Sequence, residues 1–197
     1  MSRFRSILRW VYALLAAFLA VGLVRLLVVT TCMLPEGGWV VINRWSYGLR
    51  MPFPSVAGYC RVAENRVEKS DRVAFDNPLE QGALEFRQVY IGRCAAGPGD
   101  SFRLNGEWFR IPLKGSRVVV TEANKALLRE VLHRHEKRQA VLGMDGKLYV
   151  DGTPVKWIRL MKNYYWMQNA AGDRAVDSRT FGLVPEELLI GKVVSQF

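Results

Sequence analysis

One segment limits how this chain can fold more than any other, the apolar run over residues 10–29. Its twenty residues, WVYALLAAFLAVGLVRLLVV, carry a single charge, at Arg25. An α-helix of this length is about 30 Å long, which matches the hydrocarbon core of a bilayer. Arg25 lies about one turn from the end of the run, where a long side chain can reach the headgroups. We therefore expect a transmembrane anchor.

The charges before this segment predict its orientation. Arg3, Arg5 and Arg9 precede the apolar run, and such basic residues mark the cytoplasmic side of a transmembrane helix. We expect a cytoplasmic basic N-terminus at residues 1–9, a single-pass anchor in the inner (cytoplasmic) membrane at residues 10–29, and a domain on the outer, periplasmic side at residues 30–197.

Two other interpretations of the N-terminal segment stay open. A cleaved signal peptide has its small residues after a shorter apolar core, whereas the alanines of residues 13–17 lie inside the run. A lipoprotein would carry its lipid on a cysteine just after the run. Cys32 lies near that place, but Thr30 and Thr31 stand where very small residues are usual. All three interpretations place an exported domain beside a membrane.

The composition is that of a globular domain with a basic surface. Of the 197 residues, 50% are hydrophobic and 23% are charged, which excludes a disordered chain. The net charge of +10 favours anionic partners. Because the basic residues are spread along the chain without a nucleic-acid-binding motif, we expect membrane lipid as a partner, and no nucleic acid.

Beyond residue 36 the apolar residues come in short bursts separated by turn signals such as Gly37-Gly38, Asn77-Pro78 and Asp145-Gly146. The dipeptide Asn105-Gly106 between two bursts predicts a β-hairpin. The pattern therefore predicts a mainly β domain with strands at residues 39–42, 72–75, 89–91, 102–104, 108–111, 118–120, 147–150 and 164–167.

One segment, residues 121–138 (TEANKALLREVLHRHEKR), has a different period. Leu127, Leu128, Val131, Leu132 and His135 recur at helical spacing behind a threonine that can cap a helix. We expect one amphipathic helix inserted in the β domain.

The remaining metal-ligating residue types give no site. His133 and His135 are interpreted as surface residues of the inserted helix, because no neighbour completes a ligand set. Cys32, Cys60 and Cys94 have no metal spacing and no CxxC pair, so unpaired thiols are expected. A Cys60–Cys94 disulfide stays open if the compartment is oxidising. No metal and no cofactor are predicted.

Four stretches, in order along the chain, resemble the boxes of the type I signal peptidases, also called leader peptidases. Residues 37–52 (GGWVVINRWSYGLRMP) resemble the strand and tyrosine-glycine turn after the nucleophile, and residues 70–78 (SDRVAFDNP) are similar to a gly-asp-x-val-x-phe box. Residues 90–100 (YIGRCAAGPGD) resemble the lysine box. Residues 165–192 match most specifically, through DSRTFG, Val184-Pro185 and Ile190-Gly191-Lys192. The resemblance implies coiled antiparallel sheets with an apolar face on the outer leaflet.

The resemblance also implies a serine nucleophile and a lysine base, and neither is found at its matching position. Either Cys32 takes the place of the serine, or the nucleophile loop after Leu34-Pro35 is deleted. Gly92 stands where the lysine belongs, and Ala175 stands where a serine orients that lysine. Glycine cannot accept a proton, and a thiol at Cys32 would need a nearby base.

Other positions are expected to keep structural roles by the same resemblance. We expect ion pairs behind the site from Arg93, Asp177 and Arg179. A tight turn is expected at Gly97, Pro98, Gly99 and Asp100. Side chains that face the membrane interface are expected at Trp45, Tyr47, Met51 and Phe53.

The functional prediction is a signal-peptidase-like membrane protein that is catalytically impaired. It would bind signal peptides, other exported segments or an envelope protein complex. The resemblance implies that extended peptide adds to a sheet edge in a groove lined by segments near residues 39–42 and 73–75. Two alternatives stay open. One is an active signal peptidase, a serine-type endopeptidase with a rearranged nucleophile and base. The other is a structural envelope subunit or lipoprotein.

Overall fold

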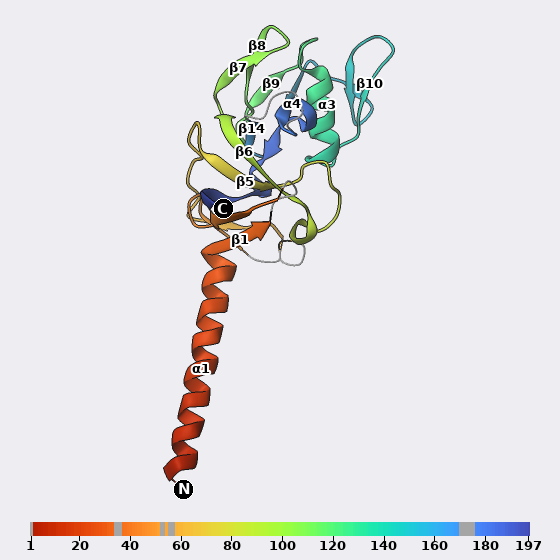
Figure 1. The fold of residues 1–197 in the computed structure, drawn as a ribbon. Coiled ribbons are helices and arrows are strands. Elements are labelled where there is room, and N and C mark those ends of the chain that lie inside the picture. Colours follow the sequence, from red (N-terminus) through yellow and green to blue (C-terminus); the bar gives the residue numbers. More distant parts are fainter. Residues whose placement is uncertain (1, 34–36, 52–53, 55–57, 170–175) are drawn as a thin grey trace.

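The computed structural model describes residues 2–33, 37–51, 54, 58–169 and 176–197, with the backbone alone at residues 2–6, 8 and 26. Two features dominate its shape, a long N-terminal helix and a β domain in which a seven-stranded body carries a smaller lobe (Figure 1).

The helix α1 (Ser2–Leu27) projects away from the domain and ends beside its first strand (Figure 1). Arg25 donates a hydrogen bond to the Thr31 hydroxyl at 2.7 Å, and Val28 N–H continues the helical bonding to Val24. Val29 already belongs to a strand, so the apolar run predicted as one helix is divided between two elements. Among the described residues, no helix satisfies both the length and the hydropathy expected of a membrane span.

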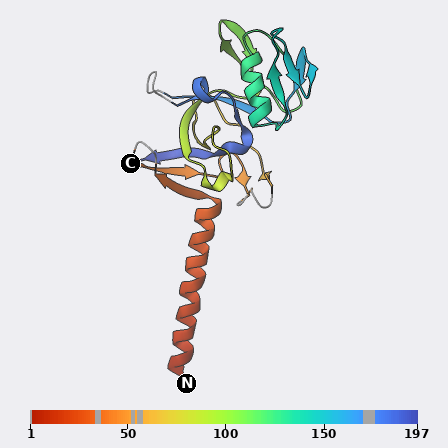
Figure 2. The ribbon, with the colours of Figure 1, turned by 90° about the vertical axis from the view of Figure 1, so that its right-hand side faces the viewer.

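The body is one antiparallel sheet of seven strands. In spatial order these are β1 (Val29–Met33), β2 (Trp39–Asn43), β16 (Leu189–Gln196), β5 (Arg72–Asp76), β6 (Val89–Ala96), β14 (Tyr164–Gln168) and β15 (Val184–Pro185). The sheet curls, and the prediction of a mainly β fold is confirmed (Figures 1 and 2).

The two faces of the sheet bury different clusters. Val73, Phe75 and Met167 belong to one cluster, whereas Ala74 and Ile42 belong to the other. Because successive side chains of a strand point to opposite faces, the side chains of Val73 and Phe75 lie on one face of the sheet and that of Ala74 lies on the other. Both sides of the sheet are therefore packed.

The lobe comprises residues 101–160 and lies at the end of the body remote from α1 (Figures 1 and 2); it is called the distal lobe below. Its helix packs on three small sheets around an apolar core that includes Leu128, Leu132 and Ile158. The elements are β7 (Ser101–Leu104), β8 (Glu107–Arg110), β9 (Arg117–Val119), α3 (Lys125–Arg134), β10 (Ala140–Leu142), β11 (Leu148–Val150), β12 (Thr153–Pro154) and β13 (Trp157–Arg159).

Short elements complete the body around the sheet. They are the pair β3 (Leu49–Arg50) and β4 (Arg61–Val62), the helix α4 (Ser178–Phe181), and the 3-10 turns η1 (Leu84–Phe86) and η3 (Glu186–Leu188).

The predicted strands are all found, and the predicted hairpin turn adopts positive φ at both Asn105 (50°) and Gly106 (87°). The inserted helix is shorter than predicted. It covers Lys125–Arg134, and the chain leaves it before Lys137, whose φ of 54° is incompatible with a helix. Cys60 and Cys94 are both free, the first exposed and the second buried, so the open possibility of a disulfide is not realised.

Candidate functional site

Gly92 lies in the middle of β6, opposite Val73 of β5. A Cβ atom at this position would lie 3.2 Å from the Cβ of Met167 and 3.3 Å from a ring carbon of Phe75. Those distances are tighter than ordinary van der Waals contact, so the apolar core already fills the space in front of Gly92. The position expected from the sequence to match the family's lysine has no side chain, and a Cβ there would require Met167 or Phe75 to shift.

Cys32 lies on β1, opposite Val40, at the edge of the sheet. Its thiol packs on the cluster formed by Val40, Ile42 and Ala74, together with Ile91. Burial raises the pKa of the Cys32 thiol, which keeps it protonated rather than thiolate at neutral pH.

The two positions do not face each other. Cys32 packs on the face of the sheet that carries the Ile91 side chain. Gly92 follows Ile91 in β6, so a side chain at Gly92 would project to the opposite face, toward Phe75 and Met167. The sheet itself therefore separates Cys32 from the lysine-equivalent position. Ala175, the third degenerate position, lies outside the described residues.

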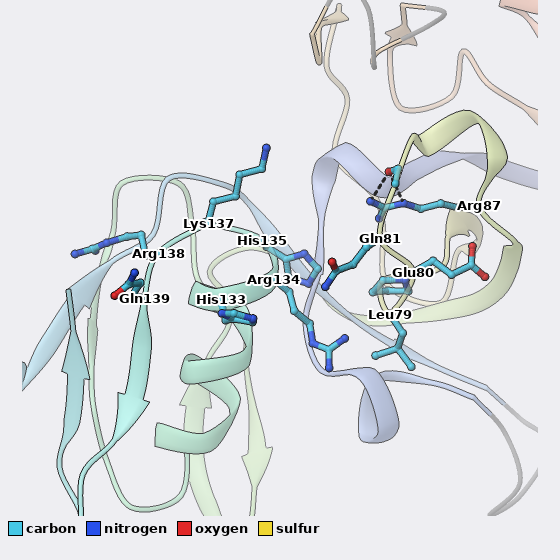
Figure 3. Close-up of a pocket in the computed structure, with 12 residues that line it drawn as sticks. Leu79, Glu80, Gln81, Arg87, His133, Arg134, His135, Lys137, Arg138 and Gln139 are labelled. Carbon is cyan, nitrogen blue, oxygen red and sulfur yellow. Dashed lines mark hydrogen bonds between the residues drawn. The ribbon is translucent and has the colours of Figure 1, made fainter. Parts of the chain in front are cut away.

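The histidines line a cleft of about 530 Å³ between the end of α3 and the loop that joins β5 to β6 (Figure 3). His133 is exposed, but His135 is 6% exposed, so its interpretation as a surface residue is wrong. Burial lowers the pKa of His135 to about 4, with smaller contributions from Lys162, Arg134 and Arg87. No residue of β1 lines this cleft, and so neither histidine serves Cys32 as a base there.

A lysine on β16 has the wrong electrostatics for a general base. The Nζ of Lys192 lies 2.6 Å from Asp71, whose other carboxylate oxygen accepts the Tyr47 hydroxyl at 3.0 Å. The hydrogen bond that Lys192 donates to Asp71, together with the negative charge of Asp71, raises the pKa of Lys192. A general-base lysine needs its pKa lowered toward neutrality, so Lys192 is a structural cation.

The box around Asp177 braces the sheet. Asp177 is buried and pairs with Arg179 at 3.0 Å. The Ser178 hydroxyl accepts the N–H of Met167 at 2.8 Å, which ties α4 to β14. Arg93, grouped with these residues from the sequence, is exposed and forms no ion pair with any described residue; the expectation for Arg93 is wrong within that part of the chain.

Residues 97–100 form a tight turn. Gly97 N–H donates to the Asp100 carboxylate at 2.9 Å, Asp100 N–H donates back to the Gly97 carbonyl at 3.0 Å, and Pro98 lies between them. Gly99 has a φ of 88°, a conformation that L side chains rarely adopt. This turn leads from β6 into the distal lobe.

The four residues expected at the membrane interface differ in exposure. Trp45 is 51% exposed and Met51 is 39% exposed, whereas Tyr47 is 3% exposed and is held in the core by Asp71. Tyr47 therefore has no surface to offer to lipid, and its assignment is corrected. Phe53 lies outside the described residues.

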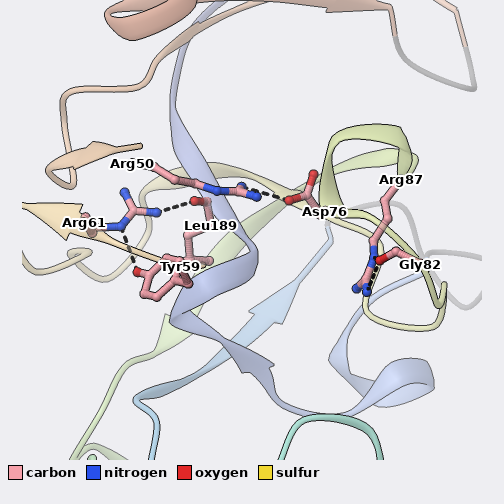
Figure 4. A network of polar contacts seen from close by, with 7 residues as sticks. All are labelled: Arg50, Tyr59, Arg61, Asp76, Gly82, Arg87 and Leu189. Carbon is pink, nitrogen blue, oxygen red and sulfur yellow. Dashed lines mark hydrogen bonds and ion pairs between the residues drawn. The ribbon is translucent and has the colours of Figure 1, made fainter. Parts of the chain in front are cut away.

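A buried arginine network, which the sequence did not reveal, lies between β3 and the sheet (Figure 4). Arg50 and Asp76 form an ion pair at 2.8 Å with side chains only 6% and 5% exposed. Arg61 donates to the Gly48 and Leu189 carbonyls and to the Tyr59 hydroxyl. The network anchors the loop after β2 to the centre of the sheet.

The segments expected to line the peptide groove, near residues 39–42 and 73–75, belong to interior strands. β2 lies between β1 and β16, and β5 lies between β16 and β6, so both of their edges are already hydrogen-bonded. Extended peptide can add only to a free edge, so neither strand can itself take up a further strand. Within the described residues, β1 pairs with β2 alone and keeps its other edge free.

A curled antiparallel sheet that carries all four boxes in order defines a protein of the signal-peptidase class. A family model described as signal peptidase, peptidase S26, matches residues 7–197, nearly the whole chain. The chain therefore belongs to the S26 signal peptidase family. No curated protein matches it at the level of significance required.

Proposed function

We propose that this chain is a membrane-anchored, catalytically impaired member of its family that binds extended polypeptide without cleaving it. One observation carries the proposal. At the lysine-equivalent position, Gly92 faces a space that Met167 and Phe75 fill. Amide hydrolysis needs a group that removes the proton of the nucleophile, and a glycine supplies none.

The free edge of β1 supports the binding part of the proposal. An extended segment can add to such an edge through backbone hydrogen bonds, which require no catalytic side chain. Cys32 on this strand is half-buried and protonated, so it contributes packing rather than nucleophilicity. Signal peptides and other exported segments are the ligands that family membership suggests.

The surface of α1 supports membrane attachment. Many of its large apolar side chains are exposed, with Trp10 72% and Phe18 76% exposed. Such an apolar surface is rarely left in water. With Arg9 and its neighbouring arginines before the apolar segment, we place the N-terminus in the cytoplasm and the β domain on the periplasmic side of the inner membrane.

The test uses the full chain in detergent micelles with a preprotein bearing an uncleaved signal peptide. We expect binding, measured by fluorescence anisotropy of the labelled signal peptide, with no new N-terminus after long incubation. The variant Val29→Pro removes a backbone N–H donor of β1, so loss of binding in this variant would locate the ligand on this strand. Ala126→Ser, at an exposed position of α3, is the control and should leave binding unchanged. Cleavage that Cys32→Ala abolishes would refute the proposal.

An active peptidase with a rearranged nucleophile and base is the second candidate, favoured by the match over residues 7–197. It predicts a covalent adduct on a serine or cysteine after exposure to an electrophilic peptide, which intact-mass spectrometry detects. A structural envelope subunit or lipoprotein is the third candidate. A lipid on Cys32 in the mature chain would favour it over the uncleaved anchor.

A further inference from the structure

The distal lobe has an exposed surface of arginine and tryptophan side chains that peptide binding on β1 does not use. The surface lies on the hairpin β7–β8 and the ribbon β9–β13, at the end of the molecule remote from α1 (Figures 1 and 2). We call it the Arg-Trp surface, and its members are Arg103, Trp108, Arg110, Arg117, Val119, Lys156, Trp157 and Arg159.

The register of the ribbon explains why these side chains are presented together. Val118 and Ile158 are buried and lie opposite each other, so their neighbours on both strands point outward. Trp157 lies opposite Val119, and these side chains are 43% and 62% exposed. The ribbon therefore exposes two apolar side chains that lie side by side.

The same register brings two positive charges face to face. Arg159 lies directly opposite Arg117 on the outward face, an arrangement that destabilises a sheet. Within the described residues neither arginine forms an ion pair. Instead the Arg117 guanidinium lies 4.3 Å from the ring centroid of Trp157, and Arg103 lies 5.5 Å from that of Trp108. The charges are held in place but are not neutralised.

Two grooves flank the ribbon, with volumes of about 490 and 660 Å³, and Arg117 lines both. Apolar side chains line each groove, among them Phe109 and Val118 in the smaller and Val155 and Ile158 in the larger. No aspartate or glutamate is among the described residues that line them. The grooves are therefore basic at the rim and apolar within.

We propose that the Arg-Trp surface docks an acidic segment of a partner protein. Carboxylates of the segment pair with Arg117 and Arg159, which removes their mutual repulsion, and its apolar side chains enter the two grooves. Arginine and tryptophan are the residue types that dominate binding energy at protein interfaces. A nucleic acid would use the same arginines but would leave the apolar groove walls without complementary side chains.

The experiment uses the full chain in detergent micelles and a short fluorescent peptide in which Glu and Leu alternate. Reference probes replace Leu by Ser, replace Glu by Lys, or are a single-stranded oligonucleotide of equal charge. We expect the Glu-Leu peptide to bind tightest. The double variant Arg117→Glu/Arg159→Glu should weaken its affinity by about tenfold or more, while Arg66→Glu, an exposed arginine of the body, should leave it unchanged.

A second variant, Trp157→Ala, keeps the net charge and should weaken binding several-fold, with circular dichroism establishing that each variant is folded. Equal affinities for the wild-type chain, the double variant and Trp157→Ala would overturn the proposal. Tighter binding of the oligonucleotide than of the Glu-Leu peptide would overturn the choice of partner. Neither result bears on peptide binding at β1, which lies on the body.

Discussion

The interior of the seven-stranded body and the Arg-Trp surface of the distal lobe use charged side chains in opposite ways. In the body, Arg50 pairs with Asp76 deep inside, and Lys192 pairs with Asp71. On the distal lobe, Arg117 and Arg159 oppose each other in solvent without a carboxylate. The paired charges inside the body therefore belong to its architecture, whereas Arg117 and Arg159 on the Arg-Trp surface have no acidic partner among the described residues. The predictions below test this contrast.

The largest effect is expected at the buried pair. Burial raises the pKa of Asp76 even beside Arg50, which indicates how strongly the interior disfavours charge there. Removing one partner, by Asp76→Leu or Arg50→Met, should lower the free energy of unfolding by about 3–5 kcal/mol. The double variant should restore stability, since it leaves no unpaired charge. Urea unfolding in detergent measures all three.

The matched control is Asp151→Asn on the distal lobe. This substitution removes the ion pair with Arg138. The side chains of Arg138 and Asp151 are 41% and 51% exposed, so the free energy of unfolding should fall by less than about 1 kcal/mol. Equal losses for Asp76→Leu and Asp151→Asn would contradict the contrast between the two regions.

A pH effect of somewhat smaller size is expected from His135. Its pKa is about 4 in the folded protein, below its ordinary 6.5, so the unfolded chain binds more protons between these values. The stability that neutral His135 contributes is complete above pH 6.5 and is lost as pH falls toward 4, by about 3 kcal/mol in total. His135→Phe should reduce this pH dependence of unfolding, and His133→Gln, at an exposed position, should not.

The packing in front of Gly92 predicts the third effect. Gly92→Ala should lower stability by about 1–3 kcal/mol, because the new methyl group must displace Met167 or Phe75. Gly97→Ala is the control at the end of the same strand, since its Cβ would meet nothing closer than 3.6 Å. If Met167→Gly, which removes the Cβ that the new methyl group would meet, fails to relieve the Gly92→Ala defect in a double-mutant cycle, the crowding argument is wrong.

The smallest effect has the opposite sign. Arg159→Thr removes the like charge opposite Arg117 and should raise the free energy of unfolding by about 0.2–1 kcal/mol. If this variant is more stable and also binds the Glu-Leu peptide more weakly, the repulsion between Arg117 and Arg159 costs stability but serves partner binding. A destabilised variant would mean that Arg159 contributes to the fold.

Much of the fold was predictable because turn residues divide the sequence into strands. Asn105-Gly106 predicted the hairpin of β7 and β8, and the motif DSRTFG with its neighbours indicated the family. Strand β1 (Val29–Met33) was missed because it begins within the apolar run, although the β-branched Val29, Thr30 and Thr31 favour a strand. His135 did share the helical spacing of Leu128 and Leu132, and that signal of burial was available.

The site was less predictable because its geometry depends on sheet register. The sequence alone indicates that Gly92 stands where a lysine is expected. It does not predict that Cys32 and Gly92 lie on opposite faces of the sheet. Nor could it link Arg50 to Asp76, since no period relates the two positions. Such pairings arise only when strands distant in sequence become neighbours.

The position of β16 has a consequence for how the protein is made. This strand is inserted between β2 and β5, and Trp39 exchanges hydrogen bonds with Phe197 across almost the whole sequence. While the chain is emerging, β1–β2 and β5–β6 are hairpins with unsatisfied edges, whereas the distal lobe can already collapse around local contacts. Long-range strand pairing of this kind is slow and aggregation-prone. Until β16 is synthesised and pairs with β2 and β5, the open edges of these strands make the nascent body prone to aggregation.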